Sequence, residues 1–318
     1  LCRQILHFQP KVLILSEMNE GNLYDIELEL KEALGATTLV PLISDIRNKE
    51  RMEEIFAEYK PTLLFHAAAY KQVPLMEDNV SECIENNVKG TQNLVDLADQ
   101  YGVSRFIFIS TDKAVRPSSC MGATKRLCEI IIQAKSEVSS TQFSSVRFGN
   151  VLGSRGSVIP LFKKQIADGG PVTVTDPNIE RYFMTIKEAV SLVLQCGKMS
   201  RSGENFILDM GKPVKIVELA KQMIAISNRD RRHPIDIEFV GLRPGEKLTE
   251  ELFYDEGQAS KTAHDKILIG KPRCFDLDMV QKELVELFAF ANANTNPSAI
   301  RQALFNCIDS LMAAPVPD

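Results

Sequence analysis

Three reactive side chains follow the apolar run of residues 106–110, which has the β-branched and aromatic composition of a buried strand. Thr111, Asp112 and Lys113 come directly after that run. A carboxyl group beside an amine supplies one proton donor and one proton acceptor, which is what general acid–base catalysis requires. Because successive strand residues face opposite sides, both groups reach one substrate only if the chain has left strand geometry by Asp112. Taken alone, Asp112 and Lys113 could also form an ordinary solvated turn.

A second pair, Met121 and Lys125, stands at the start of the next predicted helix. Their i,i+4 spacing places both on one helical face, and we expect that face to share an edge with Thr111. Lys125 could bind a ligand there or be an exposed helix lysine. Met121 cannot take a proton, and methionine serves more often in packing than in catalysis, so we expect it to shape the site.

The elements that must position these residues alternate between short β-branched runs and helical patterns. This alternation predicts an α/β fold with a doubly wound, Rossmann-type parallel sheet and crossover helices. The predicted strands of the first half are residues 11–15, 38–43, 62–69, 106–111 and 144–150. The predicted helices between them are residues 22–34, 50–59, 80–101 and one that begins near Met121.

After about residue 153 the alternation becomes less regular. Candidate strands are residues 172–175, 205–210 and 235–240, candidate helices are residues 186–196 and 216–227, and helical periodicity covers residues 276–312. We therefore predict a dinucleotide-binding domain at residues 1–153, to which residues 185–200 return, and a smaller α+β substrate lobe that makes up most of residues 154–318.

The ends of three predicted strands carry residues that suit a dinucleotide. Glu17 ends the run of residues 12–17, where a carboxylate can bind the adenosine ribose, although a strand-final Glu is often simply solvated. Asp45 and Ile46 could contact adenine, and the small residues 67–69 (Ala67, Ala68 and Ala69) let a cofactor approach the backbone. No glycine-rich phosphate loop precedes Glu17. Since residues 1–8 resemble the remainder of a helix, we expect the first strand and the glycine loop to lie upstream, which makes this chain a fragment.

Composition excludes several classes of protein. The net charge is −5, with 42 acidic against 37 basic residues, which argues against nucleic acid as the partner. The one arginine-rich cluster, residues 229–233, lacks aromatic interleaving and is typical of a solvated loop. Seven cysteines without a CxxC pair and four histidines without ligand spacing predict neither a disulfide framework nor a metal site. No apolar run approaches the ~20 residues of a membrane span, so we expect a soluble protein in a reducing cytoplasm.

Six ordered motifs carry a resemblance that covers almost the whole chain. They are NLY at 22–24, HAAAYKQVPLME at 66–77, NVKGT at 87–91, STDKAVRP at 110–117, VRFGNVLGSRGSVIP at 146–160 and GLRPGEKL at 241–248. Together they resemble the cytoplasmic catalytic domain of the membrane-anchored bacterial UDP-N-acetylglucosamine 4,6-dehydratases, polysaccharide biosynthesis proteins of the extended short-chain dehydrogenase/reductase superfamily. Most members of that superfamily have Tyr-x-x-x-Lys. The membrane-anchored branch has Met in place of Tyr, as this chain does at Met121.

The resemblance implies a redox-neutral reaction: C4 oxidation by a nicotinamide, loss of the 6-hydroxyl with the C5 proton, and return of hydride to C6. It implies Lys113 as the C5 base and Asp112 as the acid at the 6-oxygen, which requires a neutral amine and a protonated carboxyl. We expect burial and the Lys125 cation to lower the pKa of Lys113. Thr111 would orient the C4 hydroxyl, whose proton would pass to Asp112 or to water.

The resemblance also implies the cofactor and substrate contacts. Lys125 and Asn87 would bind the cofactor, which we expect to be NAD because the Glu17 carboxylate repels the 2′-phosphate of NADP. Guanidinium groups suit the phosphates of UDP. The implied substrate residues are Lys71, Gln72, Asn150, Arg155, Val158, Arg181, Arg243 and Glu246. A homo-oligomer is expected, and so is a cytoplasmic location, with the inner membrane reached only through segments outside this chain.

Two other functions remain open from the sequence. A UDP-sugar 4-epimerase shares the C4 oxidation but needs no acid or base at C5 and C6, so the Asp112 and Lys113 pair separates it from a dehydratase. A nucleotide-sugar sensor without catalysis would fit Met121 and the lack of a glycine loop.

Overall fold

The structure is a computed structural model that describes residues 1–154, 156–227, 234–254, 259–271 and 273–315. Arg155, predicted to bind phosphate, lies outside the described residues, as does the arginine-rich segment 229–233. No helix in these described ranges is long and apolar enough to cross a lipid bilayer.

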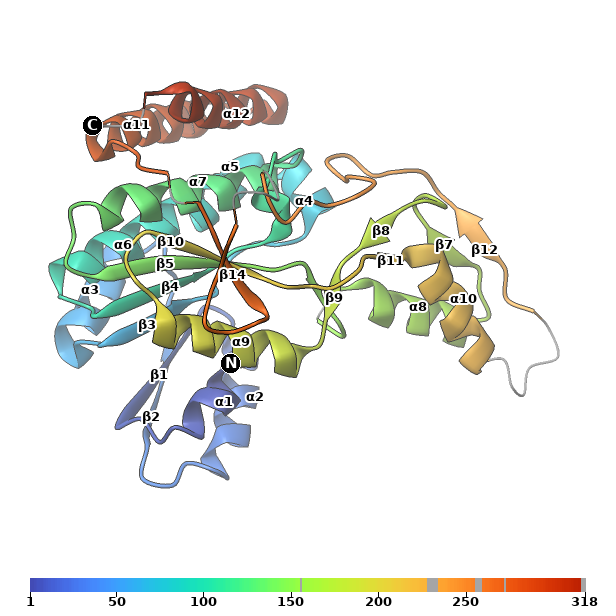
Figure 1. The fold of residues 1–318 in the computed structure, drawn as a ribbon, viewed down its shortest axis with the longest axis horizontal. Helices are drawn as coiled ribbons and strands as arrows, with labels where there is room; N and C mark the ends of the chain where they lie inside the picture. The colour runs from blue at the N-terminus through green and yellow to red at the C-terminus, as the bar shows by residue number, and fades with distance from the viewer. Residues whose placement is uncertain (155, 228–233, 255–258, 272, 316–318) are drawn as a thin grey trace.

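Six of the described strands form the main sheet, in the order β13-β14-β10-β5-β4-β3 (Figure 1). They are β3 (Leu63–His66), β4 (Arg105–Ile109), β5 (Gln142–Arg147), β10 (Glu204–Leu208), β13 (Ser260–Lys261) and β14 (Ile267–Gly270). Strands β3, β4, β5 and β10 are parallel, whereas β14 runs antiparallel to β10. The carboxyl ends of the four parallel strands therefore meet at one edge, where α/β sheets bind their ligands.

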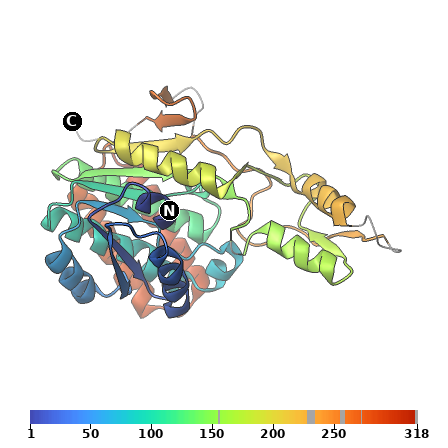
Figure 2. The ribbon, with the colours of Figure 1, turned by 90° about the horizontal axis from the view of Figure 1, so that it is seen from below.

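Helices cover both faces of this sheet, as Figure 2 shows. Because side chains alternate along a strand, Phe106 and Phe108 of β4 join one core and Ile107 joins another. The first core includes α3 (Lys49–Tyr59), α6 (Gly90–Gln100) and α7 (Cys120–Ser136), and the second includes α9 (Ile186–Met199). This two-sided covering confirms the prediction of a doubly wound α/β fold.

The C-terminal helices extend the first core. The predicted stretch 276–312 consists of α11 (Leu277–Ala293) and α12 (Pro297–Ala313), with the break where Pro297 opens the second helix. Both pack on α7, whose residues are almost all buried because the helix is enclosed between them and the sheet (Figure 1). The range predicted mainly for the substrate lobe, residues 154–318, includes both helices.

Two N-terminal strands form a separate parallel pair among the described residues. They are β1 (Val12–Glu17) and β2 (Thr38–Ile43), joined by α2 (Glu20–Lys31). Leucines of the pair, of α2 and of α1 (Cys2–Leu6) form a small core of their own. The side chain of Asn19 caps α2, which explains why that helix begins directly after β1.

The predicted helix at residues 80–101 is interrupted by a π-helix. It comprises α5 (Val80–Cys83), the π-helical turn η1 (Ile84–Lys89) and α6. This wider turn carries Asn87, whose side chain exchanges hydrogen bonds with the backbone of Tyr70, at 2.8 Å and 3.0 Å. It therefore fixes the loop after β3.

A second lobe is formed by the described residues of 158–183 and 214–250. Its elements are α8 (Val158–Ala167), β7 (Val172–Val174), β8 (Glu180–Arg181), β11 (Val214–Lys215), α10 (Ile216–Ser227) and β12 (Ile237–Phe239). Phe162, Val172 and Ile216 belong to its separate core. The short pair β6 (Asn150–Val151) and β9 (Phe183–Met184) links it to the main sheet. The domain boundary at residue 153 stays a prediction.

Candidate active site

A cavity of about 410 Å³ lies where the carboxyl ends of β3, β4 and β5 meet the second lobe. Most of the predicted site residues line it: Ala67, Ala69, Lys71, Gln72, Thr111, Lys113, Met121, Lys125, Asn150, Val158, Arg181, Arg243 and Glu246. The structure therefore brings together residues that are up to about 180 positions apart in the sequence (from 67 to 246). The predicted residues outside the lining are Glu17, Asp45, Ile46, Ala68, Asn87 and Asp112.

The chain leaves strand geometry where the two proposed catalytic groups require it. Thr111 is extended, and a 3₁₀ turn, η2 (Asp112–Ala114), begins at the next residue. The Thr111 hydroxyl accepts a hydrogen bond from the Lys113 amide at 3.4 Å and donates to Asp112 Oδ1 at 2.8 Å. Lys113 consequently lines the cavity, whereas Asp112 is fully buried next to it.

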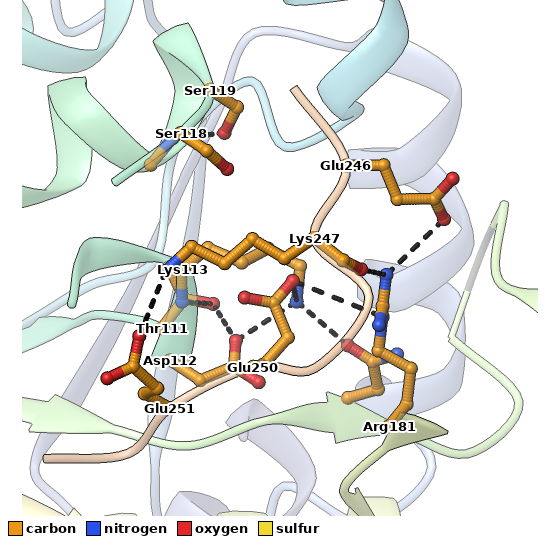
Figure 3. Close-up of polar contacts among 12 residues, drawn as sticks. Thr111, Asp112, Lys113, Ser118, Ser119, Arg181, Glu246, Lys247, Glu250 and Glu251 are labelled. Carbon is orange, nitrogen blue, oxygen red and sulfur yellow. Dashed lines mark hydrogen bonds and ion pairs between the residues drawn. The ribbon is translucent and has the colours of Figure 1, made fainter. Parts of the chain in front are cut away.

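The Lys113 amine lies in a cluster of opposite charges (Figure 3). Its Nζ donates to Asp112 Oδ1 at 3.0 Å and to Asn150 Oδ1 at 3.1 Å, and lies 3.6 Å from Glu250 Oε1. Burial acts to lower the pKa of Lys113, but the Asp112 and Glu250 carboxylates outweigh it and hold that pKa above its ordinary value. The expectation of a neutral Lys113 is therefore wrong for this arrangement, because two carboxylates flank the amine.

Glu250 is a candidate site residue that no sequence motif predicts. It lines the cavity, is only 4% exposed, and lies 4.0 Å from Arg181 Nε through Oε1. Burial raises its pKa, and the Lys113 cation acts against that rise. The only signal in the sequence is its position just after the GLRPGEKL motif, where a polar Thr-Glu-Glu run is typical of solvated chain.

The helix α7 brings Met121 and Lys125 under the cavity. Ser119 begins this helix by accepting a hydrogen bond from the Gly122 amide at 3.1 Å. Lys125 Nζ donates to the Ile109 carbonyl at 2.8 Å and lies 4.3 Å from the centre of the Phe108 ring, and burial lowers its pKa to about 8. Met121 packs with Met76 and Cys83, in agreement with a role in shaping the site.

Gly122 is the point at which α7 meets the 3₁₀ turn, since a Cβ there would lie 2.3 Å from the Lys113 carbonyl oxygen. We expect Gly122→Ala to lower the free energy of unfolding by about 1–3 kcal/mol, because the methyl group must push the turn or the helix aside. Gly21→Ala is the matched control: its nearest neighbour, Asn19 Oδ1, would lie 3.5 Å away, so alanine fits and stabilises α2 slightly. Urea unfolding measures the stability of both variants. Equal unfolding midpoints for the two variants would contradict the expected loss of stability in Gly122→Ala.

The predicted cofactor residues divide into two groups. Ala67 and Ala69 line the cavity beyond β3. Asp45 is engaged by Arg47, with Nη2 at 2.7 Å from Oδ2, and this guanidinium lowers the pKa of the Asp45 carboxyl. Glu17 ends β1 and accepts the Asn19 amide at 2.9 Å. Ile46 is buried against Gly90, and a Cβ added to Gly90 would lie 2.5 Å from Cδ1 of Ile46. The cofactor contacts of these residues, of Ala68 and of Asn87 stay predictions.

Arg181 holds the loop of the second lobe that closes the cavity. It is buried, donates to the backbone carbonyls of Lys247 at 2.8 Å and Leu248 at 3.1 Å, and lies 3.3 Å from Glu246 Oε1 (Figure 3). Glu246 also accepts the Arg243 amide at 3.2 Å. The guanidinium of Arg181 is therefore occupied in fixing this loop.

A clamp from the C-terminal helix reaches the rim of the cavity. Arg301 of α12 donates to Glu77 Oε2 at 3.1 Å and to the Ser118 carbonyl at 2.9 Å. Glu77, in α4 (Val73–Asp78), also accepts the Cys120 amide at 2.6 Å. Ser118 lines the cavity and donates to the Gly245 carbonyl at 2.9 Å. The clamp thus joins α12, α4 and the segment that opens α7.

A fully buried ion network supports the ends of β4 and β5. Glu129 of α7 accepts hydrogen bonds from Ser110 at 2.6 Å, from Arg147 at 2.7 Å and 2.5 Å, and from Arg126 at 3.1 Å. Burial alone would raise the pKa of Glu129, but the two guanidinium groups and Ser110 together hold it at about 2. Arg126 and Arg147 lie over the Tyr254 ring, 5.2 Å and 5.6 Å from its centre.

Known proteins with similar sequences carry names from polysaccharide and nucleotide-sugar metabolism. The chain is 50% identical over 294 residues to the capsular polysaccharide biosynthesis protein CapD of Staphylococcus aureus, covering 91% of this chain and 49% of that protein. It is 38% identical over 235 residues to a UDP-glucose 4-epimerase of Rickettsia rickettsii, covering 73% of this chain and 67% of that protein. It is 34% identical over 248 residues to a UDP-N-acetylglucosamine 4,6-dehydratase (inverting) of Campylobacter jejuni, covering 77% of this chain and 70% of that protein. The chain thus spans about half the length of CapD.

Solved structures agree with this fold. Pen from Bacillus thuringiensis superposes with a TM-score of 0.78 at 35% identity, over 85% of this chain and 83% of that chain. The dTDP-glucose 4,6-dehydratase DesIV from Streptomyces venezuelae, solved with NAD and TYD bound, gives a TM-score of 0.66 at 22% identity, over 79% and 81%. The second likeness concerns the fold alone. A family of proteins described as polysaccharide biosynthesis protein matches residues 1–272, and the chain belongs to that family.

Proposed function

We propose that this chain is the catalytic domain of an NAD-dependent 4,6-dehydratase that converts UDP-N-acetylglucosamine to a UDP-4-keto-6-deoxy sugar in bacterial polysaccharide or glycan biosynthesis. The observation that carries the proposal is the Lys113 amine in the cavity wall, with Asp112 at 3.0 Å and Glu250 at 3.6 Å. Elimination across C5 and C6 needs groups that accept and donate protons at adjacent carbons. A relative at 34% identity is named for this reaction.

The residues at the carboxyl ends of β1 and β3 fit NAD. Ala67 and Ala69 are small enough to let a cofactor approach the backbone, and the Lys125 amine lines the same cavity. Glu17, at the end of β1, suits the hydroxyls of the adenosine ribose and disfavours the 2′-phosphate of NADP. The chemistry that NAD supplies when bound is the acceptance of a hydride from the sugar and the later return of that hydride.

Within this proposal, Lys113 removes the C5 proton, while the Asp112 carboxylate takes up the C4 hydroxyl proton during oxidation and then passes it to the departing 6-oxygen. Asp112 Oδ2 is buried and has no hydrogen-bond partner among the described residues. A Cβ on Gly149, a cavity residue, would lie 3.1 Å from that oxygen, so glycine keeps the space beside the acid open. Thr111 orients the C4 hydroxyl, and Met121 shapes the pocket without taking a proton.

The second lobe supplies the nucleotide contacts. Arg243 lines the cavity and suits the phosphates of UDP, with Glu246 beside it, while Arg181 acts by holding their loop. Lys71, Gln72, Asn150 and Val158 also line the cavity, and we assign them to the sugar. Burial lowers the pKa of Lys71.

A UDP-sugar 4-epimerase is the second candidate, because a relative at 38% identity has that name. An epimerase returns hydride to C4 and needs no proton transfer at C5. The Asp112, Lys113 and Glu250 cluster would then have no chemical task, which is why we favour the dehydratase.

Incubation with UDP-N-acetylglucosamine in deuterated water, followed by NMR, separates these functions. The full-length protein is the sample, because this chain spans only about half the length of CapD. We expect a 4-keto-6-deoxy sugar with deuterium at C5, and the configuration at C5 distinguishes retention from inversion. A product that keeps its 6-hydroxyl contradicts the dehydratase: a C4 epimer would indicate the epimerase, and bound but unchanged substrate would indicate the sensor.

The setting of the domain belongs to the same proposal. We infer a cytoplasmic location, a homo-oligomer, no nucleic-acid partner, and anchoring to the bacterial inner membrane through segments outside these residues. The Staphylococcus aureus relative is named for capsular polysaccharide, which fits assembly of a glycan at that membrane.

A further inference from the structure

Glu250 gives the site a second buried carboxylate with spare capacity to accept a proton. Its Oε1 lies 3.6 Å from Lys113 Nζ and 4.0 Å from Arg181 Nε (Figure 3). Its Oε2 is buried without a hydrogen-bond partner among the described residues. It reaches the cavity from the loop of the second lobe, whereas Lys113 comes from the main sheet.

The position of Lys113 creates a problem for a base. An amine between two carboxylates holds its proton, yet it must be neutral to remove a proton from carbon. The groups that face Lys113 are Asp112, Glu250, Asn150 and the Arg181 cation. Asp112 also has an unpartnered oxygen, Oδ2, but this carboxylate is the one that takes the C4 hydroxyl proton and passes it to the 6-oxygen. Glu250 is therefore the remaining group that can take the proton.

We propose that Glu250 accepts the proton of Lys113, so that the amine is neutral when it attacks the C5 hydrogen. An N–H bond of the ammonium breaks and an O–H bond forms on the carboxylate, which leaves the net charge of the pair unchanged. The proton then remains inside the site and does not have to exchange with solvent. Glu250 acts through Lys113 and is a positioning residue, and this inference rests on the proposed dehydratase function.

Opposing influences act on the proton shared between Lys113 and Glu250. Loss of solvation favours the uncharged amine and acid, because burying two ions is costly. Attraction between Lys113 and Glu250 favours the ions, as do the Arg181 and Lys247 cations that face Glu250, whereas the Asp112 carboxylate favours the uncharged acid. Burial is the largest influence on Glu250 and raises its pKa, in the direction that makes it a proton acceptor.

The pH dependence of Glu250→Gln tests this role, because an amide has the same size but cannot take the proton. The full-length enzyme is mixed with the 4-keto-6-deoxy product in deuterated water, and NMR follows exchange at C5, which is acidic without any hydride transfer. We expect wild-type exchange to change little between about pH 6 and about pH 9. In Glu250→Gln the amine must lose its proton to solvent, so exchange falls by roughly 10²-fold at neutral pH and rises about tenfold per pH unit.

Glu250→Asp keeps a carboxylate and should restore a flat profile at a lower rate. Glu188→Gln, which alters an ion-paired glutamate of α9 outside the cavity, should match the wild type. A flat pH profile of C5 exchange in Glu250→Gln, whether slower or unchanged, would overturn the inference. If Glu250→Gln does not fold, a steep pH profile in Glu250→Asp would overturn it. Wild-type conversion of UDP-N-acetylglucosamine is measured in parallel: if it fails, the proposed function is wrong, and if it succeeds, the profiles judge Glu250 alone.

Discussion

Lys113→Arg is expected to lower kcat for dehydration by roughly 10²–10⁴-fold while the protein stays folded and binds UDP. Arginine keeps the positive charge between Asp112 and Glu250, so the buried carboxylates remain paired. A guanidinium does not lose its proton in a protein, so it cannot serve as the C5 base. The measurement is turnover of UDP-N-acetylglucosamine, with UDP binding by calorimetry and deuterium at C5 by NMR.

The matched control for this change is Lys221→Arg, at an exposed ion pair with Glu218 on α10. It should leave turnover within a few-fold of the wild type. If Lys113→Arg retains wild-type kcat and C5 deuterium, Lys113 serves only as a charge and the base lies elsewhere. If UDP binding is lost as well, the substitution has disturbed the cavity and the assignment of a base is not supported.

Glu129→Gln is expected to reduce the free energy of unfolding at neutral pH by about 3–5 kcal/mol, because it leaves the buried Arg147 and Arg126 without their carboxylate. Urea unfolding measures the change. Glu54→Gln, in an exposed pair with Arg51, is the control and should cost at most about 1 kcal/mol. Adding Arg147→Met to Glu129→Gln should recover part of the loss, since the uncompensated charge is removed. Strict additivity of the two changes would contradict a coupled network.

The same network predicts a pH dependence of stability. The pKa of Glu129 lies at about 2 in the folded protein, below its ordinary value of 4.5, so the folded state favours the ionised form. The stability from this group is complete above about pH 4.5 and is lost as pH falls through about 2. The difference between wild type and Glu129→Gln should therefore shrink on acidification, and a difference that grows below about pH 4 would contradict this.

The fold could be predicted to the extent that it depends on local pattern. The predicted strands 106–111 and 205–210 contain apolar runs typical of buried strands, and they appear as β4 (Arg105–Ile109) and β10 (Glu204–Leu208). Strands β13 and β14 were missed because two and four residues give too short a pattern. The π-helical turn around Asn87 was not predicted, because a helical spacing of apolar residues predicts a helix but does not distinguish an α-helix from a π-helix.

The candidate site could be predicted where residues follow strand ends, as Thr111 and Lys113 do. Its electrostatics could not be predicted in that way, because they depend on contacts between distant segments. Glu250 lies 137 positions after Lys113 (250 − 113), and its charge, together with the larger effect of the adjacent Asp112, reverses the expected direction of the lysine pKa. Likewise, no local pattern predicts that Arg181, expected to bind phosphate, donates hydrogen bonds to the backbone of Lys247 and Leu248.

The Arg301 clamp has a bearing on how mutational scans of this domain are interpreted. Although α12 contributes no residue to the cavity lining, its Arg301 donates a hydrogen bond to the backbone carbonyl of Ser118, which lies 183 positions earlier in the sequence. A scan scored by product formation should therefore flag position 301 together with Glu77. Such distant hits would report the alignment of the rim and give no sign of a second ligand site. Homologous sequences that exchange one partner of the clamp should have exchanged the other as well.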